Sequence, residues 1–500
     1  MQEFLLNKFT RFFLVLSFIL LLFFTRGAKG SPLYFQKEKD TKISGPFEVS
    51  ISSSRYALTE SIVKNHSLFL DKKLAQFSSP DIGDKNGKFF SLFPPGVSFI
   101  GVPFYFIGKF IGLPQLTTFF SIAFFAFINM LLVSILARRL GCNIYSALMS
   151  GFIFLFATNA LVYSEIFVQH HASTTLLLLL ILNCLKTRSW KNNLALGLLY
   201  GFSALVDIPN LVIFFPLVVH MLIKSKKTNV SLGALVGGIV FLLLIFGFYN
   251  RALTDSFVKL PQSIGRSHFF RNTTGGQNPA EYKNNPIKNG LSIANIAFDI
   301  NNPLYGLYIL LLSNERSWLF YSPVILLGFI GLFKARQRKK LRTVVNLLFI
   351  IIIFNILLYS LYDDPWGGWA FGPRYLIPSA ALLSLGVGFA IERYKKSFFS
   401  VLLFLSLFLY SIAVNILAAV TTSTIPPKIE AVRFDSPLSY TYTFNFPLLE
   451  FNISSNLFYN IFLSSRVKLL YYLLVLIFIT FIVGLALLKK ALLKENKLMK

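Results

Sequence analysis

The chain has 500 residues, of which 55% are hydrophobic and 14% are charged, and its mean hydropathy is +0.63. A soluble protein of this length would carry roughly 25% charged residues. The composition therefore argues against a soluble protein and indicates a polytopic membrane protein.

The net charge of +27 comes largely from basic tracts that lie between apolar segments. These tracts are "ARRLG", "KTRSWK", "KSKK", "KARQRKKLR", "ERYKK" and "KKALLKENKLMK". Because short loops rich in Lys and Arg stay on the cytoplasmic side, they predict orientation and argue against nucleic acid as a partner. Cys142 and Cys184 both lie near predicted cytoplasmic ends, which implies no disulfide framework.

The first apolar segment, residues 9–27, is predicted to be a retained first span within a first unit of residues 1–27. Lys8, Arg11, the apolar core and the small residues of "RGAKGS" would also suit a cleaved signal peptide. Under both interpretations the chain from residue 31 onward starts on the outer face.

Residues 28–115 are predicted to form an outer loop with interfacial helices. In "LFPPGVSFIGVPFYFIGKFIGL", Pro94, Pro95 and Pro103 disfavour one regular helix and favour an interfacial or re-entrant segment. The segment "SSRYALTESIV" has apolar residues at helical spacing. It suits an amphipathic helix on the membrane surface, or equally a helix packed within a small outer domain.

The remaining apolar segments predict eleven further spans, which makes twelve with both termini inside. They cover about 116–137, 144–163, 167–185, 193–207, 209–223, 229–249, 318–333, 342–361, 375–391, 398–418 and 469–488. A single tilted span over 193–223 would place "KARQRKKLR" outside, against the charge bias.

These spans divide the chain into bundles and outer loops of an all-α fold. The units are a bundle at 116–249, an outer loop with the re-entrant "LYGLYILLL" at 250–317, a bundle at 318–418, an outer loop at 419–467, and the last helix with its basic tail at 468–500.

The outer stretch "YDDPWGGWAFGPRYL" concentrates special residues between two spans. Gly367 and Gly368 permit a tight turn, and Trp366 and Trp369 suit the membrane interface. Arg374 could present its planar fork to a phosphate or carboxylate. The alternative is an aromatic-belt loop whose arginine reaches lipid headgroups.

Two carboxylates lie in the first outer loop, in "SSPDIGDKNGKFFSLFPPG". Asp81 or Asp84, held above a membrane-facing groove, could take a proton from an acceptor hydroxyl. The alternative for each is a solvated acidic turn.

Ionisable residues also stand at the outer ends of two spans. "YSEIFVQHHASTT" contains Glu165, His170 and His171, and "LLLSNERSWLFYSP" contains Glu315 and Arg316. Such groups face a cavity or pair with one another between helices. No Walker loop, Rossmann fingerprint, CxxC pair or HExxH motif is present, which excludes ATP-driven pumping and zinc-protease chemistry in their usual forms.

The order "SRYALTESIV", "PDIGDKNGKFFSLFPPG", "NPLYGLYILLLSNERSWLFYSPVILLGFIGLF" and "DDPWGGWAFGPRYLIP" resembles bacterial multi-pass glycosyltransferases of the GT-C superfamily. The resemblance covers most of residues 50–395 and points to relatives of the dolichyl-phosphate-mannose protein mannosyltransferases. It implies a GT-C-like bundle of about twelve helices that takes a sugar from a polyprenyl-phosphate carrier on the outer face, usually with inversion.

The resemblance also implies roles for individual residues. Asp81 would be the general base, with Asp84 as the second catalytic candidate. The donor phosphate would be bound by Arg374, together with Arg316 or His170, and the loop with Trp366, Gly367, Gly368 and Trp369 would shape the site. In this sequence, Leu92 and Phe93 stand where relatives carry an acid and a lysine, and "SSSRY" lacks the carboxylate that many members have there.

We therefore expect a glycosyltransferase, hexosyl or pentosyl, in a bacterial cytoplasmic membrane with its site facing outward. Its partners would be the polyprenyl-phosphate sugar donor, membrane lipids and a protein, lipid or glycan acceptor. The sequence makes no cofactor certain; two nearby acids could hold a divalent metal ion, but no ligand spacing demands one. The rival functions are a transporter or flippase of lipid-linked sugars, which needs no base, and a non-catalytic envelope-assembly protein.

Overall fold

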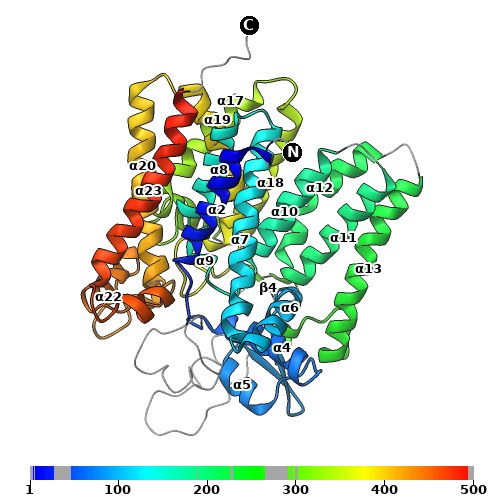
Figure 1. Cartoon of the computed structure of the whole chain (residues 1–500). Helices are drawn as coiled ribbons and strands as arrows, with labels where there is room; N and C mark the ends of the chain where they lie inside the picture. Colours follow the sequence, from blue (N-terminus) through cyan, green and yellow to red (C-terminus); the bar gives the residue numbers. More distant parts are fainter. Residues whose placement is uncertain are drawn as a thin grey trace.

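A bundle of long helices and a smaller, loop-rich region at one of its ends make up the protein (Figure 1). The computed structural model describes residues 4, 6–27, 47–186, 189–225, 229–264, 291–293, 296–298 and 302–493. Most of the predicted second outer loop lies outside these residues, as do Arg266, Arg271 and the sequon at Asn272.

Helices account for nearly all of the bundle. They are α2 (Lys8–Leu22), α7 (Pro114–Arg139), α8 (Ile144–Phe156), α9 (Ala160–Tyr163), α10 (His170–Cys184), α11 (Trp190–Val206), α12 (Pro209–Ser225), α13 (Asn229–Thr254), α15 (Pro303–Leu311), α16 (Trp318–Tyr321), η2 (Pro323–Leu326), α17 (Leu327–Arg336), α18 (Arg342–Ser360), η3 (Arg374–Leu376), α19 (Ile377–Tyr394), α20 (Phe398–Val420) and α23 (Leu469–Leu493).

Each of the twelve segments predicted to span the membrane contains helix in the structure. Among the described residues, six helices are long and apolar enough to cross a bilayer, and four further apolar helices are shorter. The all-α polytopic fold is confirmed. The twelve crossings, their orientation and the unit boundaries stay predictions.

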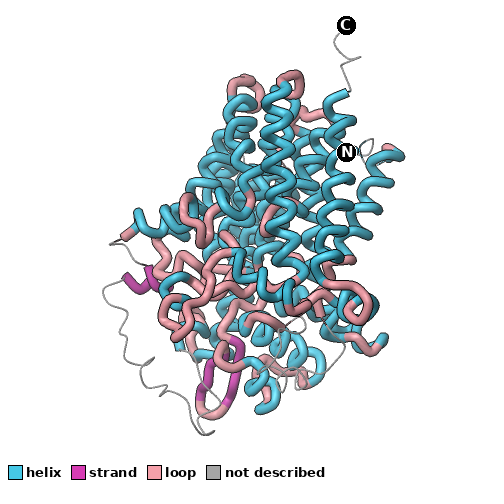
Figure 2. The backbone as a smooth tube through the Cα atoms, turned by 90° about the vertical axis from the view of Figure 1, so that its left-hand side faces the viewer, coloured by secondary structure: helices cyan, strands magenta, loops and turns pink. Residues whose placement is uncertain are grey.

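The two ends of the bundle differ in charge. Four bundle helices end in basic residues at one end, at Arg138 and Arg139 of α7, Lys334 of α17, Arg393 of α19 and Lys490 of α23, whereas α13 ends with Arg251 at the other. The opposite end carries the loops and both strand pairs (Figure 2). We call these the basic end and the loop end.

The loop end contains the short elements of the chain. These are α4 (Ser50–Lys64), α5 (Lys72–Ser78), β1 (Ile82–Lys85), β2 (Lys88–Ser91), α6 (Gly96–Ile111), η1 (Pro261–Ile264), β3 (Leu291–Ile293), β4 (Ile296–Phe298), α21 (Lys428–Ala431), η4 (Tyr442–Asn445), α22 (Phe446–Glu450) and η5 (Tyr459–Leu463). β1 and β2 form an antiparallel hairpin in which Asp84 pairs with Phe89, and β3 pairs with β4.

The structure corrects one local expectation for this end. Pro103 does not break its segment, because α6 runs through it as one helix that packs on α4 and α7 and so offsets the lost hydrogen bond. In α4, the residues 52–61 are all buried, so of the two alternatives for this segment the structure shows the packed helix.

The first helix is joined to the last part of the chain. The side-chain amide of Asn456 donates to the carbonyl of Phe23 at 2.7 Å, and Arg26 forms a backbone bridge with Asn456. The buried guanidinium of Arg26 is paired with Glu48 and donates to the carbonyl of Ala418. The end of α2 that meets the loop end is therefore fixed by three distant segments.

Glycines set the spacing of α17 and α19. A Cβ on Gly331 would lie 1.9 Å from the carbonyl oxygen of Gly386, and one on Gly328 would lie 2.1 Å from that of Leu383. Small residues let membrane helices approach closely and gain van der Waals contact. The α17–α19 pair therefore depends on the absence of side chains at these positions.

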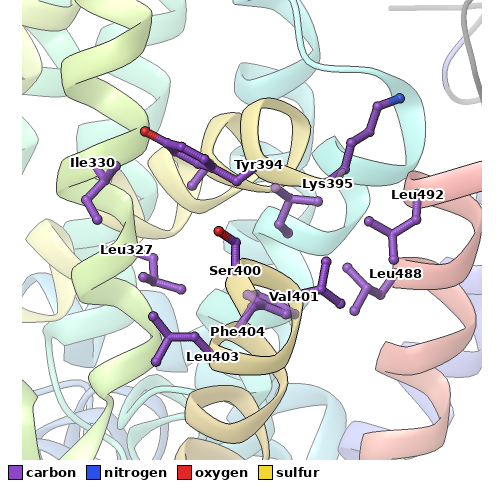
Figure 3. A pocket seen from close by; sticks show the side chains of 12 residues that line it. Leu327, Ile330, Tyr394, Lys395, Ser400, Val401, Leu403, Phe404, Leu488 and Leu492 are labelled. Carbon is purple, nitrogen blue, oxygen red and sulfur yellow. The ribbon is translucent and has the colours of Figure 1, made fainter. Parts of the chain in front are cut away.

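A pocket of about 210 Å³ opens at the basic end between α17, α19, α20 and α23 (Figure 3). Its wall is mostly apolar, with Leu327, Ile330 and Phe404 among the lining residues, while Lys395 and Ser400 supply polar groups. It contains none of the predicted site residues.

We predict that Gly331→Ala destabilises the protein by about 1–3 kcal/mol, because the new methyl group overpacks a closed helix contact. The matched control is Gly237→Ala on α13, where an added Cβ meets nothing within 4 Å. Thermal unfolding in detergent should show a lower midpoint for the first variant and no loss for the second. Equal midpoints would contradict the proposed role of close packing.

Candidate functional site

The loop from Tyr362 to Pro373 forms a tight turn that seats Arg374. The Asp364 carboxylate accepts a hydrogen bond from the N–H of Gly368 at 3.0 Å, and its carbonyl accepts from Gly367. Gly367 and Gly368 have φ angles of +73° and +63°, which strain residues with a side chain. A Cβ on Gly367 would lie 2.6 Å from Arg374 Nε, so this glycine also makes room for the guanidinium.

The Arg316 guanidinium stabilises the same loop through hydrogen bonds to its backbone carbonyls. Its Nε donates to the carbonyl of Trp366 at 3.1 Å, and its Nη2 donates to the carbonyls of Gly368 and Ile425. Its Nη1 donates to the carbonyl of Glu315 at 2.7 Å. The guanidinium is fully buried and directed at backbone oxygens, so Arg316 braces the loop instead of presenting itself to a ligand.

Further contacts fix the two ends of the loop. The Tyr163 hydroxyl donates to the carbonyl of Phe371 and accepts from its N–H at 3.0 Å. The indole Nε1 of Trp369 donates to Glu430 at 2.6 Å, and the ring of Trp366 contacts Tyr305 edge-on. The loop is therefore a rigid part of the structure.

His170 lies at the start of α10, beside this loop. It is 4% exposed, and its ring contacts Tyr163 and Tyr375 with centroid distances of 5.2 and 6.4 Å. The positive charges of Arg374 and Arg55 both act on it. The structure thus brings His170 and Arg374 near one another, and their binding of a donor phosphate stays a prediction.

Arg55 of α4 is a site residue that the sequence did not single out. Its side chain is 1% exposed, its Nη1 donates to Gln169 Oε1 at 2.6 Å, and its guanidinium lies over the Phe93 ring. Burial, together with the charge of Arg374, lowers the pKa of Arg55 to about 10, against the opposite effects of Asp207 and Asp81. Two buried arginines therefore face one site.

Three nitrogens of this cluster are buried and lack a hydrogen-bond partner among the described residues: Arg55 Nε, His170 Nε2 and Arg374 Nε. Neither arginine forms an ion pair within the described part of the chain. Buried donors are almost always satisfied in folded proteins. Two buried arginines with an unsatisfied donor each, next to an imidazole nitrogen without a partner, are the arrangement expected of an anion-binding site, and we call Arg55, His170 and Arg374 the anion cluster.

The carboxylates are distributed unequally around the anion cluster. Asp81 is 1% exposed, accepts a hydrogen bond from the Ser50 hydroxyl and acts electrostatically on Arg55. Asp84 is exposed in the β1–β2 hairpin, where its carboxylate accepts from the N–H of Gly87 at 2.9 Å. Asp84 therefore caps a turn and does not join Asp81 at the cluster.

Asp207 is a second carboxylate at the cluster, and it lies between α11 and α12. It acts on Arg55 more strongly than Asp81 does, and Arg374 acts on it as well. Burial raises the pKa of the Asp207 carboxyl to about 6, against the influence of Arg55, a hydrogen bond from Gln169, and Arg374. In the sequence, Asp207 stands in the short segment "DIPN" between two predicted spans, which did not single it out as a site residue.

Tyrosines form one wall of the site. The rings of Tyr359 and Tyr375 stack at 4.2 Å with 2° between their planes, and Tyr362 meets both rings edge-on. In the described parts of the chain, no group of three or more His, Cys, Asp or Glu residues could hold a metal ion. The arrangement is suited to binding an anion beside an aromatic surface, with carboxylates at its edge.

The two arginines of the predicted phosphate site should respond differently to substitution. We predict that Arg316→Gln destabilises the protein by about 2–4 kcal/mol, because several buried carbonyls lose their donors. Arg374→Gln should change stability by less than about 1 kcal/mol, since it removes a buried cation whose Nε has no partner. Thermal unfolding of both variants tests this, and a larger loss for Arg374→Gln would contradict the assignment.

No protein-family model matches the chain, and no curated protein sequence matches it. The solved structures that are similar to the chain include two of ArnT from Cupriavidus metallidurans. The apo structure is 13% identical and covers 97% of this chain and 77% of its own, with a TM-score of 0.48. The structure bound to undecaprenyl phosphate is 12% identical and covers 97% and 78%, with a TM-score of 0.50. At this identity the similarity shows the fold alone: the chain shares the fold of ArnT, which agrees with the GT-C-like bundle expected from the sequence.

Proposed function

We propose that the protein is a membrane glycosyltransferase that moves a sugar from a polyprenyl-phosphate carrier to an acceptor. The observation that carries this proposal is the anion cluster, in which Arg55, His170 and Arg374 direct buried, unsatisfied nitrogens to one place. A lipid-linked phosphate could satisfy these donors, and the basic residues at the opposite end of the bundle would anchor the orientation.

The similarity to ArnT supports the same proposal. That protein has been captured with undecaprenyl phosphate, and its fold extends over 97% of the present chain. We extend this class of ligand to the present chain because the anion cluster offers the charges that a lipid phosphate needs. The donor would then be a polyprenyl-phosphate hexose or pentose, and the acceptor a protein, lipid or glycan.

The residues of the cluster would act on the leaving group. As the bond from the anomeric carbon to the phosphate oxygen breaks, negative charge grows on that oxygen. Arg374 and Arg55 would stabilise this charge, and His170 Nε2 could add a hydrogen bond. Removing one such preorganised donor costs about 3–4 kcal/mol of transition-state stabilisation. A carboxylate beside the cluster would take the acceptor proton, and Asp81 remains the base expected from the sequence.

We place the reaction on the outer face of a bacterial cytoplasmic membrane, with inversion at the anomeric carbon. The loop end holds the anion cluster, while the basic end carries the Lys and Arg residues typical of the cytoplasmic side. Arg316 would serve the site indirectly, by fixing the loop that carries Arg374.

We predict that the purified protein in lipid vesicles releases sugar from undecaprenyl phosphate that carries mannose, glucose, galactose or arabinose. Arg374→Gln and Arg55→Gln should each lower the rate about 100- to 1,000-fold, because each removes charge from the leaving phosphate. The control is Arg251→Gln, on an exposed arginine at the end of α13.

Sugar transfer that survives both substitutions would contradict the proposed role of the anion cluster. If the wild-type protein releases no sugar but moves the intact lipid-linked sugar between leaflets, it is a transporter or flippase. Loss of the rate in Arg251→Gln as well would indicate that the assay reports folding instead of the site.

A further inference from the structure

We propose that Asp207 is the general base of this site and removes the proton from the acceptor hydroxyl. The inference rests on the proposed function and names a residue that neither the sequence motifs nor the resemblance assigned. Three observations support it. Asp207 lies at the junction of two helices, Gln169 connects it to Arg55, and three other carboxylates already have structural partners in the fold.

The backbone fixes Asp207 at the junction of two helices. Its N–H donates to the carbonyl of Ser203 at the end of α11, and its carbonyl accepts from the N–H of Asn210 in α12. The Asn210 side chain in turn donates to Ser203 and to the Ser173 hydroxyl of α10. Three helices therefore hold this turn, and a residue held in this way keeps its geometry during a reaction.

Gln169 orients the Asp207 carboxylate. Its Oε1 accepts from Arg55 Nη1 at 2.6 Å, so the amide nitrogen is the group left to donate. The Gln169 side chain is hydrogen-bonded to Asp207, which thus accepts from that amide nitrogen. A carboxylate has two oxygens and about four acceptor positions, so this bond leaves capacity for an acceptor hydroxyl.

The surroundings of Asp207 suit proton transfer near neutral pH. The charged groups that act on it are Arg55 and Arg374, and it acts in turn on the hydroxyls of Tyr359 and Tyr362. Burial raises its pKa to about 6, so the carboxylate is ionised at pH 7.5 yet more basic than an exposed aspartate. It is half-buried, which leaves it reachable by a substrate.

Three other carboxylates have structural tasks, and Asp81, which accepts a hydrogen bond from the Ser50 hydroxyl, is the remaining candidate. Asp84 caps the hairpin turn, and Asp364 caps the glycine turn of the Arg374 loop. Glu48 pairs with Arg26 and accepts two hydrogen bonds from Ser423. Asp81 is almost fully buried and ranks behind Asp207 in its effect on Arg55.

The step balances without a further reactant. The acceptor oxygen forms a bond to the anomeric carbon and gives its proton to the Asp207 carboxylate. The bond from that carbon to the phosphate oxygen breaks, and its electron pair stays on the phosphate, held by Arg55 and Arg374. Asp207 then returns the proton to water when the products leave.

The test compares Asp207→Asn and Asp81→Asn in the sugar-release assay, with Asp435→Asn, on an exposed loop carboxylate, as the control. We expect Asp207→Asn to lower kcat about 100- to 10,000-fold, the usual contribution of a general base. The Asp207→Asn variant should still bind undecaprenyl phosphate. Its thermal stability at pH 7.5 should be at least that of the wild type, because burial disfavours the charge of the aspartate. Asp207→Glu should restore part of the rate.

The pH profile gives an independent measurement. In the wild type, kcat should fall about tenfold per pH unit below about pH 6, since the base becomes protonated there. Asp207→Asn should remove this limb from its residual activity.

The following results of these measurements would each overturn the inference. A wild-type kcat in Asp207→Asn, or the main loss in Asp81→Asn, would move the base to Asp81. Equal losses of kcat and of undecaprenyl phosphate binding would make Asp207 a binding residue. A wild-type protein that releases no sugar would refute the proposed function, and the inference with it.

Discussion

The structure depends on burying positive charge at the loop end without neutralising it. An arginine taken out of water is costly unless it is paired and hydrogen-bonded. Arg374 and Arg55 each keep a buried Nε that has no partner among the described residues. Such an arrangement persists only where the surrounding structure determines it, as for other unfavourable features at functional sites. We interpret the rest of the loop end as the framework that keeps these two arginine side chains buried despite the free-energy cost.

That framework includes Arg316, to which the resemblance gave a role at the donor phosphate, and two residues that the sequence did not single out, Arg26 and Tyr163. Arg316 uses its guanidinium on backbone carbonyls, and Arg26 uses its own on Glu48 and Ala418. Tyr163 closes the far end of the Arg374 loop. The arginines differ in their hydrogen-bond partners. Arg316 and Arg26 donate to protein oxygens, whereas the arginines of the anion cluster each keep a buried Nε without a partner among the described residues.

Periodicity and charge predicted the bundle well, because apolar length and basic tracts are local properties of the chain. They also indicated Arg374, His170 and the glycines of the Arg374 loop. They failed where the decisive contact is between distant segments. Pro103 is accommodated by packing on α4 and α7, and the role of Arg316 depends on carbonyls at Gly368 and Ile425. Arg55 and Asp207 were missed because Gln169, which lies between them, connects them only in three dimensions.

The bond between Asn456 and Phe23 has a consequence for how the protein is made. The two residues are 433 positions apart in the sequence. The first helix can therefore make its final contacts only after nearly the whole chain has been synthesised. Arg26, three residues further on, pairs with Glu48 in the segment that leads into α4 and contacts the end of α20. Membrane insertion of the helices can proceed one after another as the ribosome advances. Assembly of the loop end is by contrast a late event, so a nascent chain cut short before this point would carry inserted helices but an unfinished site.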